Sequence, residues 1–141
     1  DNDTWKIPAK RTKNEKSHIV PLTPLMKKII GSEQQNIGYV FSVSGKNPIN
    51  NIGRAAEKLR NFMNENSSQD IPNWTLHDLR RTAASEMAKA GIYVEVIEKV
   101  QNRSGGKLRG VAGIYNRYDY AKEKREALTL WCQTIERLVQ P

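Results

Sequence analysis

Near the middle of the chain, an imidazole and a guanidinium stand three positions apart in the run Leu76–Thr82, as His77 and Arg80. Residues at this spacing lie on one face of a helix, so both side chains can reach a common target. Thr75, with Asp78 three residues later, predicts a capping box that begins the helix here. Free N–H groups and the helix dipole at such a start favour an anion. The pair therefore indicates a phosphate site, and a solvated surface pair is the alternative.

A second group of candidate residues lies in the segment 101–117, which contains no acidic residue. Its glycines allow the backbone to approach a bulky ligand closely. A tyrosine, Tyr115, stands near its end, and the segment carries four cations: Arg103, Lys107, Arg109 and Arg117. This pattern suits a phosphodiester ligand. Taken alone, the segment is better explained as a solvated loop whose tyrosines pack as amphipathic side chains.

The composition favours a nucleic-acid partner. The chain has 141 residues, 23 Lys and Arg against 15 Asp and Glu, a net charge of +8 and a pI near 9.7. This charge balance is typical of nucleic-acid binding, although membranes and acidic proteins also attract basic surfaces. With one cysteine, Cys132, and two histidines, we expect no structural metal site. No apolar run approaches the ~18 residues of a membrane span, so we expect a cytoplasmic protein.

The elements that must position these residues are mostly helical. Two short apolar segments, 5–8 and 18–22, flank a polar, largely basic turn and predict a β-hairpin. Thr23 and Pro24 predict the start of a helix that ends at Gly31. We expect a short buried segment at Tyr39–Phe41.

Apolar spacing predicts further helices at 49–65, 76–90, 92–100 and 120–139. In the second of these we expect Leu76, Leu79, Ala83 and Met87 to face a core, with Gly91 as the C-terminal stop. The predicted fold class is mainly α with a small antiparallel β-hairpin, an α+β domain.

These motifs, in this order, closely resemble the tyrosine recombinase family. His77-x-x-Arg80 within LHDLRRT, then Gly91-Ile92 and then Gly113-Ile114-Tyr115-Asn116, are similar to the integrases of prophages and genomic islands. The hairpin with Thr12-Lys13-Asn14 resembles the lysine-bearing hairpin of that family. The resemblance runs from about Trp5 to the last helix, and it implies a tyrosine recombinase catalytic-domain fold.

The resemblance implies a role for each matched residue. Tyr115 would be the nucleophile that forms a 3′-phosphotyrosine, Arg80 a phosphate clamp, His77 a general base or phosphate contact, and Lys13 the general acid. A phenol of pKa ~10 needs a base or a cationic neighbourhood to react at neutral pH. No metal and no other cofactor is implied, because the covalent intermediate conserves the energy of the phosphodiester bond. Tyr118 and Tyr120 are rival nucleophiles outside the motif position.

The implied partner is double-stranded DNA at attachment sites, with other integrase protomers in a synaptic tetramer and accessory excision or DNA-bending proteins. The implied location is the bacterial nucleoid, without a membrane. The last helix could dock on a neighbouring protomer or fold back on its own core. Seven further cations are expected to contact DNA: Lys10, Arg11, Lys16, Arg81, Lys107, Arg109 and Arg117.

The sequence departs from the family pattern at two places. The second histidine of the family would follow Asn102, where this chain has Arg103, which cannot transfer a proton near neutral pH. The first catalytic arginine would lie upstream of the hairpin. We therefore expect residues 1–141 to be the C-terminal part of a catalytic domain, without the N-terminal DNA-binding domain, and to bind DNA weakly without recombining it.

Two alternatives follow from the same pattern. A catalytically impaired DNA-binding remnant or regulator fits the replaced histidine. A type IB topoisomerase shares the chemistry, but the short hairpin and compact C-terminal part are more similar to an integrase.

Overall fold

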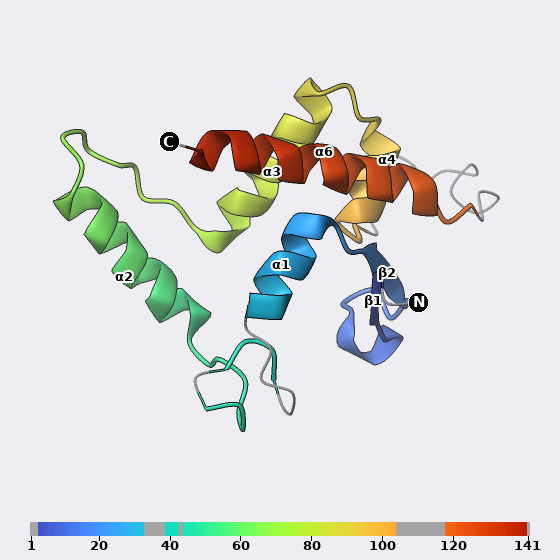
Figure 1. Cartoon of the computed structure of the whole chain (residues 1–141), viewed down its shortest axis with the longest axis horizontal. Helices are drawn as coiled ribbons and strands as arrows, with labels where there is room; N and C mark the ends of the chain where they lie inside the picture. The colour runs from blue at the N-terminus through green and yellow to red at the C-terminus, as the bar shows by residue number, and fades with distance from the viewer. Residues whose placement is uncertain (1–2, 33–38, 43, 104–117, 141) are drawn as a thin grey trace. The chain divides into compact units, whose positions relative to one another are not determined.

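The chain folds into helices and one small sheet, and a computed structural model describes residues 3–32, 39–42, 44–103 and 118–140 (Figure 1). The elements are β1 (Thr4–Ile7), the 3-10 turn η1 (Ala9–Arg11), β2 (His18–Pro21), α1 (Pro24–Ser32), α2 (Ile52–Glu65), α3 (Leu76–Lys89), α4 (Val94–Val100) and α6 (Ala121–Val139). The predicted fold class, mainly α with a small antiparallel sheet, is confirmed. The chain divides into two compact units, unit 1 (Asp1–Lys27 and Ala83–Pro141) and unit 2 (Lys28–Thr82).

The predicted hairpin is present in unit 1. Strands β1 and β2 pair antiparallel, from Thr4 opposite Pro21 to Ile7 opposite His18. Pro21 has no N–H to donate, and it stands at the end of its strand, where the ladder does not need one. The hairpin therefore ends where the next helix begins.

Helix α1 begins as the sequence predicts and ends later than predicted. The Thr23 hydroxyl accepts a hydrogen bond from the N–H of Met26 at 3.3 Å, and Pro24 occupies the first helical position. The helix passes through Gly31 to Ser32, so the predicted stop at Gly31 is wrong. Glycine in a helix interior is unfavourable by roughly 1 kcal/mol, which a helix can tolerate.

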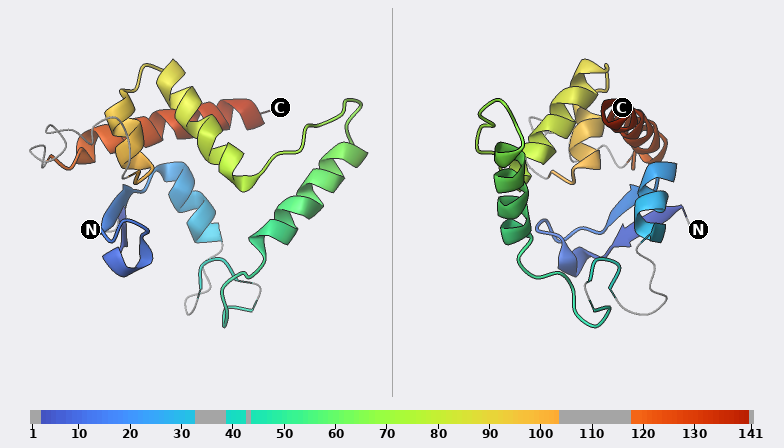
Figure 2. Two further views of the ribbon diagram at one scale, coloured as in Figure 1. Left: turned by 180° about the vertical axis from the view of Figure 1, so that it is seen from behind. Right: turned by 60° about the vertical axis from the view of Figure 1, so that its left-hand side comes forward.

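The core of unit 1 lies between α4, α6 and the second half of α3. Its buried side chains are Met87, Val96, Ile97 and Ala127. Helix α4 packs along α6, and β2 contacts α6 from another side (Figures 1 and 2). Apolar side chains of α6 are therefore buried because α4 and β2 cover them.

Helix α3 ends at the predicted glycine. Gly91 has a φ of 84°, the N–H of Gly91 donates to the carbonyl of Ala88, and the N–H of Ile92 donates to the carbonyl of Met87, both at 3.0 Å. These two bonds form a Schellman motif, in which glycine adopts the left-handed conformation without strain. Ile92 packs against the core beside Met87, which completes the motif with its usual apolar contact.

Helix α6 folds back on its own unit. The Lys124 ammonium donates to the carbonyl of Ile19 at 3.2 Å, and Cys132 Sγ lies 3.1 Å from the hydroxyl oxygen of Thr23. Burial lowers the pKa of Lys124. Of the two predicted roles for this helix, the self-contact is therefore present. Its last residues, Leu138 and Val139, are exposed.

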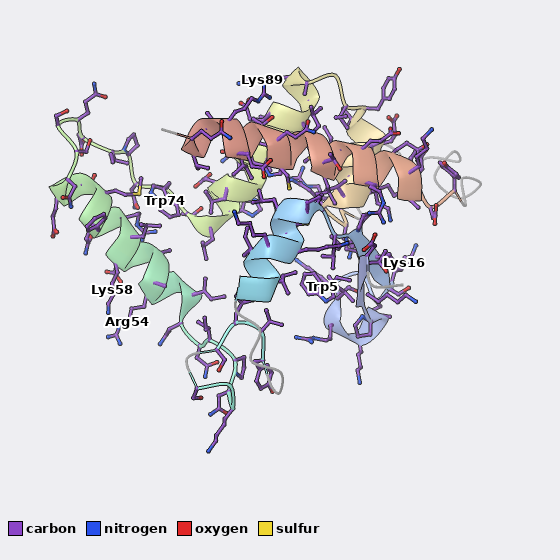
Figure 3. The ribbon with its side chains drawn as sticks, in the orientation of Figure 1. Trp5, Lys16, Arg54, Lys58, Trp74 and Lys89 are labelled. Atoms are coloured by element: carbon purple, nitrogen blue, oxygen red, sulfur yellow. The ribbon has the colours of Figure 1, made fainter. Side chains whose placement is uncertain are left out.

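Unit 2 contains α2 and the start of α3. Helix α2 begins at Ile52, three residues later than predicted, after Asn51 in the left-handed conformation with a φ of 70°. The Arg60 guanidinium donates to the carbonyl of Trp74 at 2.9 Å and lies 5.5 Å from the centroid of the Trp74 ring, which Figure 3 labels. A cation over an aromatic face, with a hydrogen bond beside it, fixes the loop after α2 against that helix.

Two predictions about burial in unit 2 are wrong. Tyr39–Phe41 is exposed, because its backbone bonds are those of a loop: the N–H of Tyr39 donates to Gly45 and the N–H of Ile49 to Phe41. The leucines at the start of α3, Leu76 and Leu79, are also exposed. The core that α3 reaches is built around Met87 at the other end of the helix.

Candidate catalytic site

The turn of the hairpin is held rigidly by its own side chains. The Thr12 hydroxyl lies 2.8 Å from the carbonyl oxygens of both Ala9 and Lys16. The N–H of Lys16 donates to Asn14 Oδ1 at 3.2 Å, and Glu15 adopts a φ of 55°. These local bonds close the turn around Lys13, whose side chain is exposed. The predicted general acid thus projects from an ordered turn.

The same turn carries a cluster of cations. The cluster consists of four exposed side chains: Lys10, Arg11, Lys13 and Lys16, the last labelled in Figure 3. None of these four side chains forms an ion pair with another described residue. Cations without carboxylate partners keep their full charge for an external anion. The turn therefore has the electrostatics of a phosphate-binding surface.

Arg103 lies at the end of α4 in a second Schellman motif. The N–H of Asn102 donates to the carbonyl of Lys99 at 3.3 Å, and the N–H of Arg103 donates to that of Glu98 at 2.9 Å. Asn102 occupies the left-handed position with a φ of 50°, which asparagine tolerates better than most residues. The backbone that presents the exposed Arg103 is thus fixed by the helix it follows.

Two tertiary hydrogen bonds join the hairpin to the end of α4. Asn14 Nδ2 donates to Asn102 Oδ1 at 2.9 Å, and His18 Nε2 lies 3.2 Å from the carbonyl oxygen of Val100. His18, the first residue of β2, is half-buried in this contact. Lys13 precedes Asn14 and Arg103 follows Asn102, so the structure brings the neighbourhoods of these two predicted site residues together.

The His77–Arg80 pair stands at the predicted helix start, in unit 2. The N–H and the hydroxyl of Thr75 donate to Asp78 Oδ2 at 3.0 and 2.7 Å, and α3 begins at Leu76. This confirms the half of the predicted capping box in which the carboxylate of Asp78 accepts the N–H of Thr75. His77 and Arg80 are both exposed on the first turns of this helix.

Asp78 also engages the second arginine of the motif. Arg81 Nη1 lies 3.3 Å from Asp78 Oδ1 in an exposed ion pair. The hydrogen bonds from Thr75, followed by the charge of Arg81, lower the pKa of Asp78 below 3.8. Asp78 is therefore ionised at neutral pH, fixing the helix start and holding Arg81 to one side.

The predicted nucleophile Tyr115 lies outside the described residues, together with Lys107, Arg109 and Arg117. Both rival tyrosines are described. Tyr118 Oη donates to the carboxylate of Glu123 at 3.0 Å, and this bond raises the pKa of Tyr118. Tyr120 stands at the start of α6 and packs against the unit 1 core, and its ring centroid lies 4.9 Å from that of Tyr118 with the two rings tilted by 59°. Both therefore have structural contacts, and the raised pKa means that the Tyr118 phenol ionises less readily than an ordinary one.

Sequence reasoning missed the two asparagines and a basic pair on α2. Arg54 and Lys58, one helical turn apart, are exposed and project from one side of α2 (Figure 3), and neither forms an ion pair within the described residues. Their spacing of four residues was the available signal. The asparagines carried no sequence signal, because Asn14 and Asn102, which bond to each other, are 88 residues apart in the chain.

Comparison with known proteins identifies the family. The sequence model of the phage integrase family matches residues 1–120. The chain belongs to the phage integrase family. Membership supports a role in site-specific DNA recombination, with DNA binding and assembly of several subunits as general properties of such proteins. Neither the curated proteins nor the solved structures contain a match to the chain.

Two features are absent from the described residues. No helix there is both long and apolar enough to cross a membrane. Among the same residues, no three side chains of the His, Cys, Asp and Glu types lie together as a metal site would require.

Proposed function

We propose that this integrase-family chain is the C-terminal part of a catalytic domain that cleaves and rejoins duplex DNA through a 3′-phosphotyrosine. The reaction would integrate or excise a prophage or another mobile element. The observation that carries the proposal is the hydrogen bond between Asn14 and Asn102, because it draws together the segments of Lys13 and Arg103.

The chemical step transfers a phosphoryl group from one oxygen to another. The Tyr115 oxygen attacks phosphorus, the new P–O bond forms, and the bond from phosphorus to the 5′-oxygen breaks. His77 accepts the phenol proton, and the Lys13 ammonium gives a proton to the departing 5′-oxygen. Arg80 holds two non-bridging oxygens of the phosphate as charge develops on them. Rejoining reverses each transfer.

Arg103 serves as a phosphate ligand in this proposal. A guanidinium donates hydrogen bonds at all physiological pH values but has no proton to spare for catalysis. With Arg103 in place of a histidine, proton transfer falls to His77 and Lys13. The reaction keeps its charge stabilisation and loses one titratable group.

Further cations would contact the DNA backbone. The cations of the hairpin turn and the Arg54–Lys58 pair, which form no ion pair among the described residues, would neutralise phosphates, together with Arg81, Lys107, Arg109 and Arg117. Phosphate contacts of this kind position a protein on the duplex and carry no sequence information. They fit a protein that must hold DNA firmly while one strand is broken.

Covalent trapping tests the proposal directly. We expect the full-length protein, expressed in its bacterial host, to retain genomic DNA after denaturation, and sequencing that DNA identifies the attachment site. Tyr115→Phe should abolish the adduct, because phenylalanine has no oxygen nucleophile. Tyr118→Phe is the matched control and should leave the adduct in place. An adduct that survives Tyr115→Phe would contradict the assignment.

A second candidate function rests on Arg103. If the replaced histidine has inactivated the protein, it binds DNA as an impaired remnant or regulator and forms no adduct. Arg103→His separates the two: in a remnant it restores cleavage, and in an active enzyme it changes the pH profile of an existing reaction. Site-independent relaxation of a supercoiled plasmid would instead indicate a topoisomerase.

A further inference from the structure

The two asparagines that join the hairpin to α4 stand beside two of the proposed site residues. Asn14 follows Lys13 in the turn, and Asn102 precedes Arg103 at the end of α4. Their side chains meet in a half-buried amide–amide hydrogen bond of 2.9 Å. Consecutive Cα atoms lie about 3.80 Å apart, so the backbone of each asparagine is directly next to that of a proposed catalytic or phosphate-binding residue.

Each asparagine is itself held in place. Asn14 Oδ1 accepts the N–H of Lys16, so its amide nitrogen is the atom that faces Asn102. Asn102 is fixed by its left-handed backbone within the Schellman motif of α4. The bond therefore joins two anchored groups, and it constrains the separation of the backbones on both sides.

We propose that Asn14 and Asn102 form a positioning latch that sets the Lys13 ammonium at the leaving 5′-oxygen. The inference rests on the proposed function and deepens it. Lysine has a long, flexible side chain, so the position of its ammonium depends on where the backbone of the turn is held. Strand pairing places the base of the hairpin, His18 ties β2 to Val100, and the latch is the contact at the turn itself.

One substitution removes the latch and leaves the backbone intact. Asn102→Gly deletes the amide, and glycine adopts a φ near 50° without strain. Asn51→Gly is the matched control, because Asn51 has a φ of 70° and makes no side-chain cap hydrogen bond at the start of α2. Asn14→Ala removes the latch from the other side.

The assay compares two leaving groups in full-length protein. The substrates are nicked duplexes of the attachment site recovered from the adduct, with either oxygen or sulfur at the bridging 5′ position. A thiol has a pKa of about 8.5, so a 5′-thiolate departs without a general acid, whereas a 5′-alkoxide needs one. Loss of a positioned acid therefore slows only the oxygen substrate.

We expect Asn102→Gly and Asn14→Ala to slow cleavage of the oxygen substrate by roughly 10- to 100-fold, the scale of a small misplacement of a catalytic group. Cleavage of the sulfur substrate should stay within about twofold of the unmodified protein. The double variant should be no slower than Asn102→Gly alone, because both changes break one interaction. Asn51→Gly should cleave both substrates normally.

The outcomes separate the latch from the function on which it rests. If Lys13→Ala slows only the oxygen substrate but Asn102→Gly slows neither, the latch is wrong and Lys13 keeps its role. Equal slowing of both substrates by Asn102→Gly would mean that the change acts on the fold or on Arg103 rather than on the Lys13 ammonium, and it would also overturn the latch. If Lys13→Ala slows both substrates equally, or the unmodified protein cleaves neither, the proposed function itself is wrong.

Discussion

The two units present their proposed site residues by different means. In unit 1, Lys13 and Arg103 lie on segments that are joined by hydrogen bonds between residues far apart in the chain. In unit 2, His77 and Arg80 lie on a helix start that is fixed by Thr75 and Asp78, within the same turn. One pair of positions depends on tertiary structure, and the other depends on local capping.

This difference predicts different sensitivities. Changes in the core of unit 1 should disturb the fold, and changes at the latch should disturb the position of Lys13. Changes at the start of α3 should act locally, because its leucines are exposed and contribute little burial.

The largest expected effect on stability lies at the core end of α3. Met87 is 2% exposed, whereas Leu79 on the same helix is 55% exposed. Met87→Ala should lower the free energy of unfolding by about 2–5 kcal/mol, through lost burial and the cavity left behind. Leu79→Ala should change it by about 0.5 kcal/mol or less. Urea unfolding of the full-length protein measures both, and similar losses would remove the contrast between the two ends.

The largest expected effect on chemistry lies at the other end of the same helix. Arg80→Ala should slow DNA cleavage by roughly 10²–10³-fold, the scale for loss of a donor to a developing oxyanion. The fold should survive, because Arg80 is exposed. Lys89→Ala removes one positive charge from the end of α3 and should leave the rate unchanged, since Lys89 pairs with Glu86. Single-turnover cleavage at saturating protein distinguishes a slower step from weaker binding.

Much of this contrast was predictable from local sequence. The hairpin, the Thr23 cap, the capping carboxylate of Asp78 and the glycine stop after α3 each depend on residues a few positions apart, and each was predicted correctly. The family resemblance, which rests on short motifs in a fixed order, is confirmed by the match over residues 1–120. Local chemistry specifies these features because their partners are already neighbours in the chain.

The incorrect predictions concern partners that the sequence does not name. Apolar spacing placed Leu79 on an inward face, but spacing cannot say whether another element covers that face. The segment 39–41 was expected to be buried because it is apolar, yet its hydrogen bonds are those of a loop. The Asn14–Asn102 bond could not be predicted for the same reason. The two asparagines are 88 residues apart, so no regular spacing in the sequence relates them. The roles of Tyr115, His77, Arg80, Lys13 and Arg103 remain predictions.

A smaller effect is expected at the basic turn of the hairpin. Lys10, Arg11 and Lys16 have no ion-pair partner among the described residues, whereas Arg81 pairs with Asp78. Replacing any one of the three by alanine should reduce the slope of log affinity against log salt by about 0.9, the contribution of one phosphate contact. Arg81→Ala should reduce it less. Salt titrations of DNA binding by fluorescence anisotropy measure each slope. If the variants of the turn have the same slope as the unmodified protein, the turn does not contact phosphate.

The smallest expected effect is a pH dependence confined to the start of α3. The pKa of Asp78 is lowered in the folded state by the hydrogen bonds from Thr75, so its stabilisation is present above the ordinary value of 3.8 and is lost as the pH falls through the lowered value. Protonation leaves the N–H of Thr75 with a weaker acceptor, and the first turn of the helix should fray. Backbone amide shifts at residues 76–79 should therefore titrate in acid, and Asp78→Asn should abolish that titration. The Asn14–Asn102 bond contains no titratable group, so the Asn14 side-chain amide signal should show no transition of its own over this range. A transition there at the same pH would mean that the latch and the cap respond together, and the division between local and tertiary positioning would be wrong.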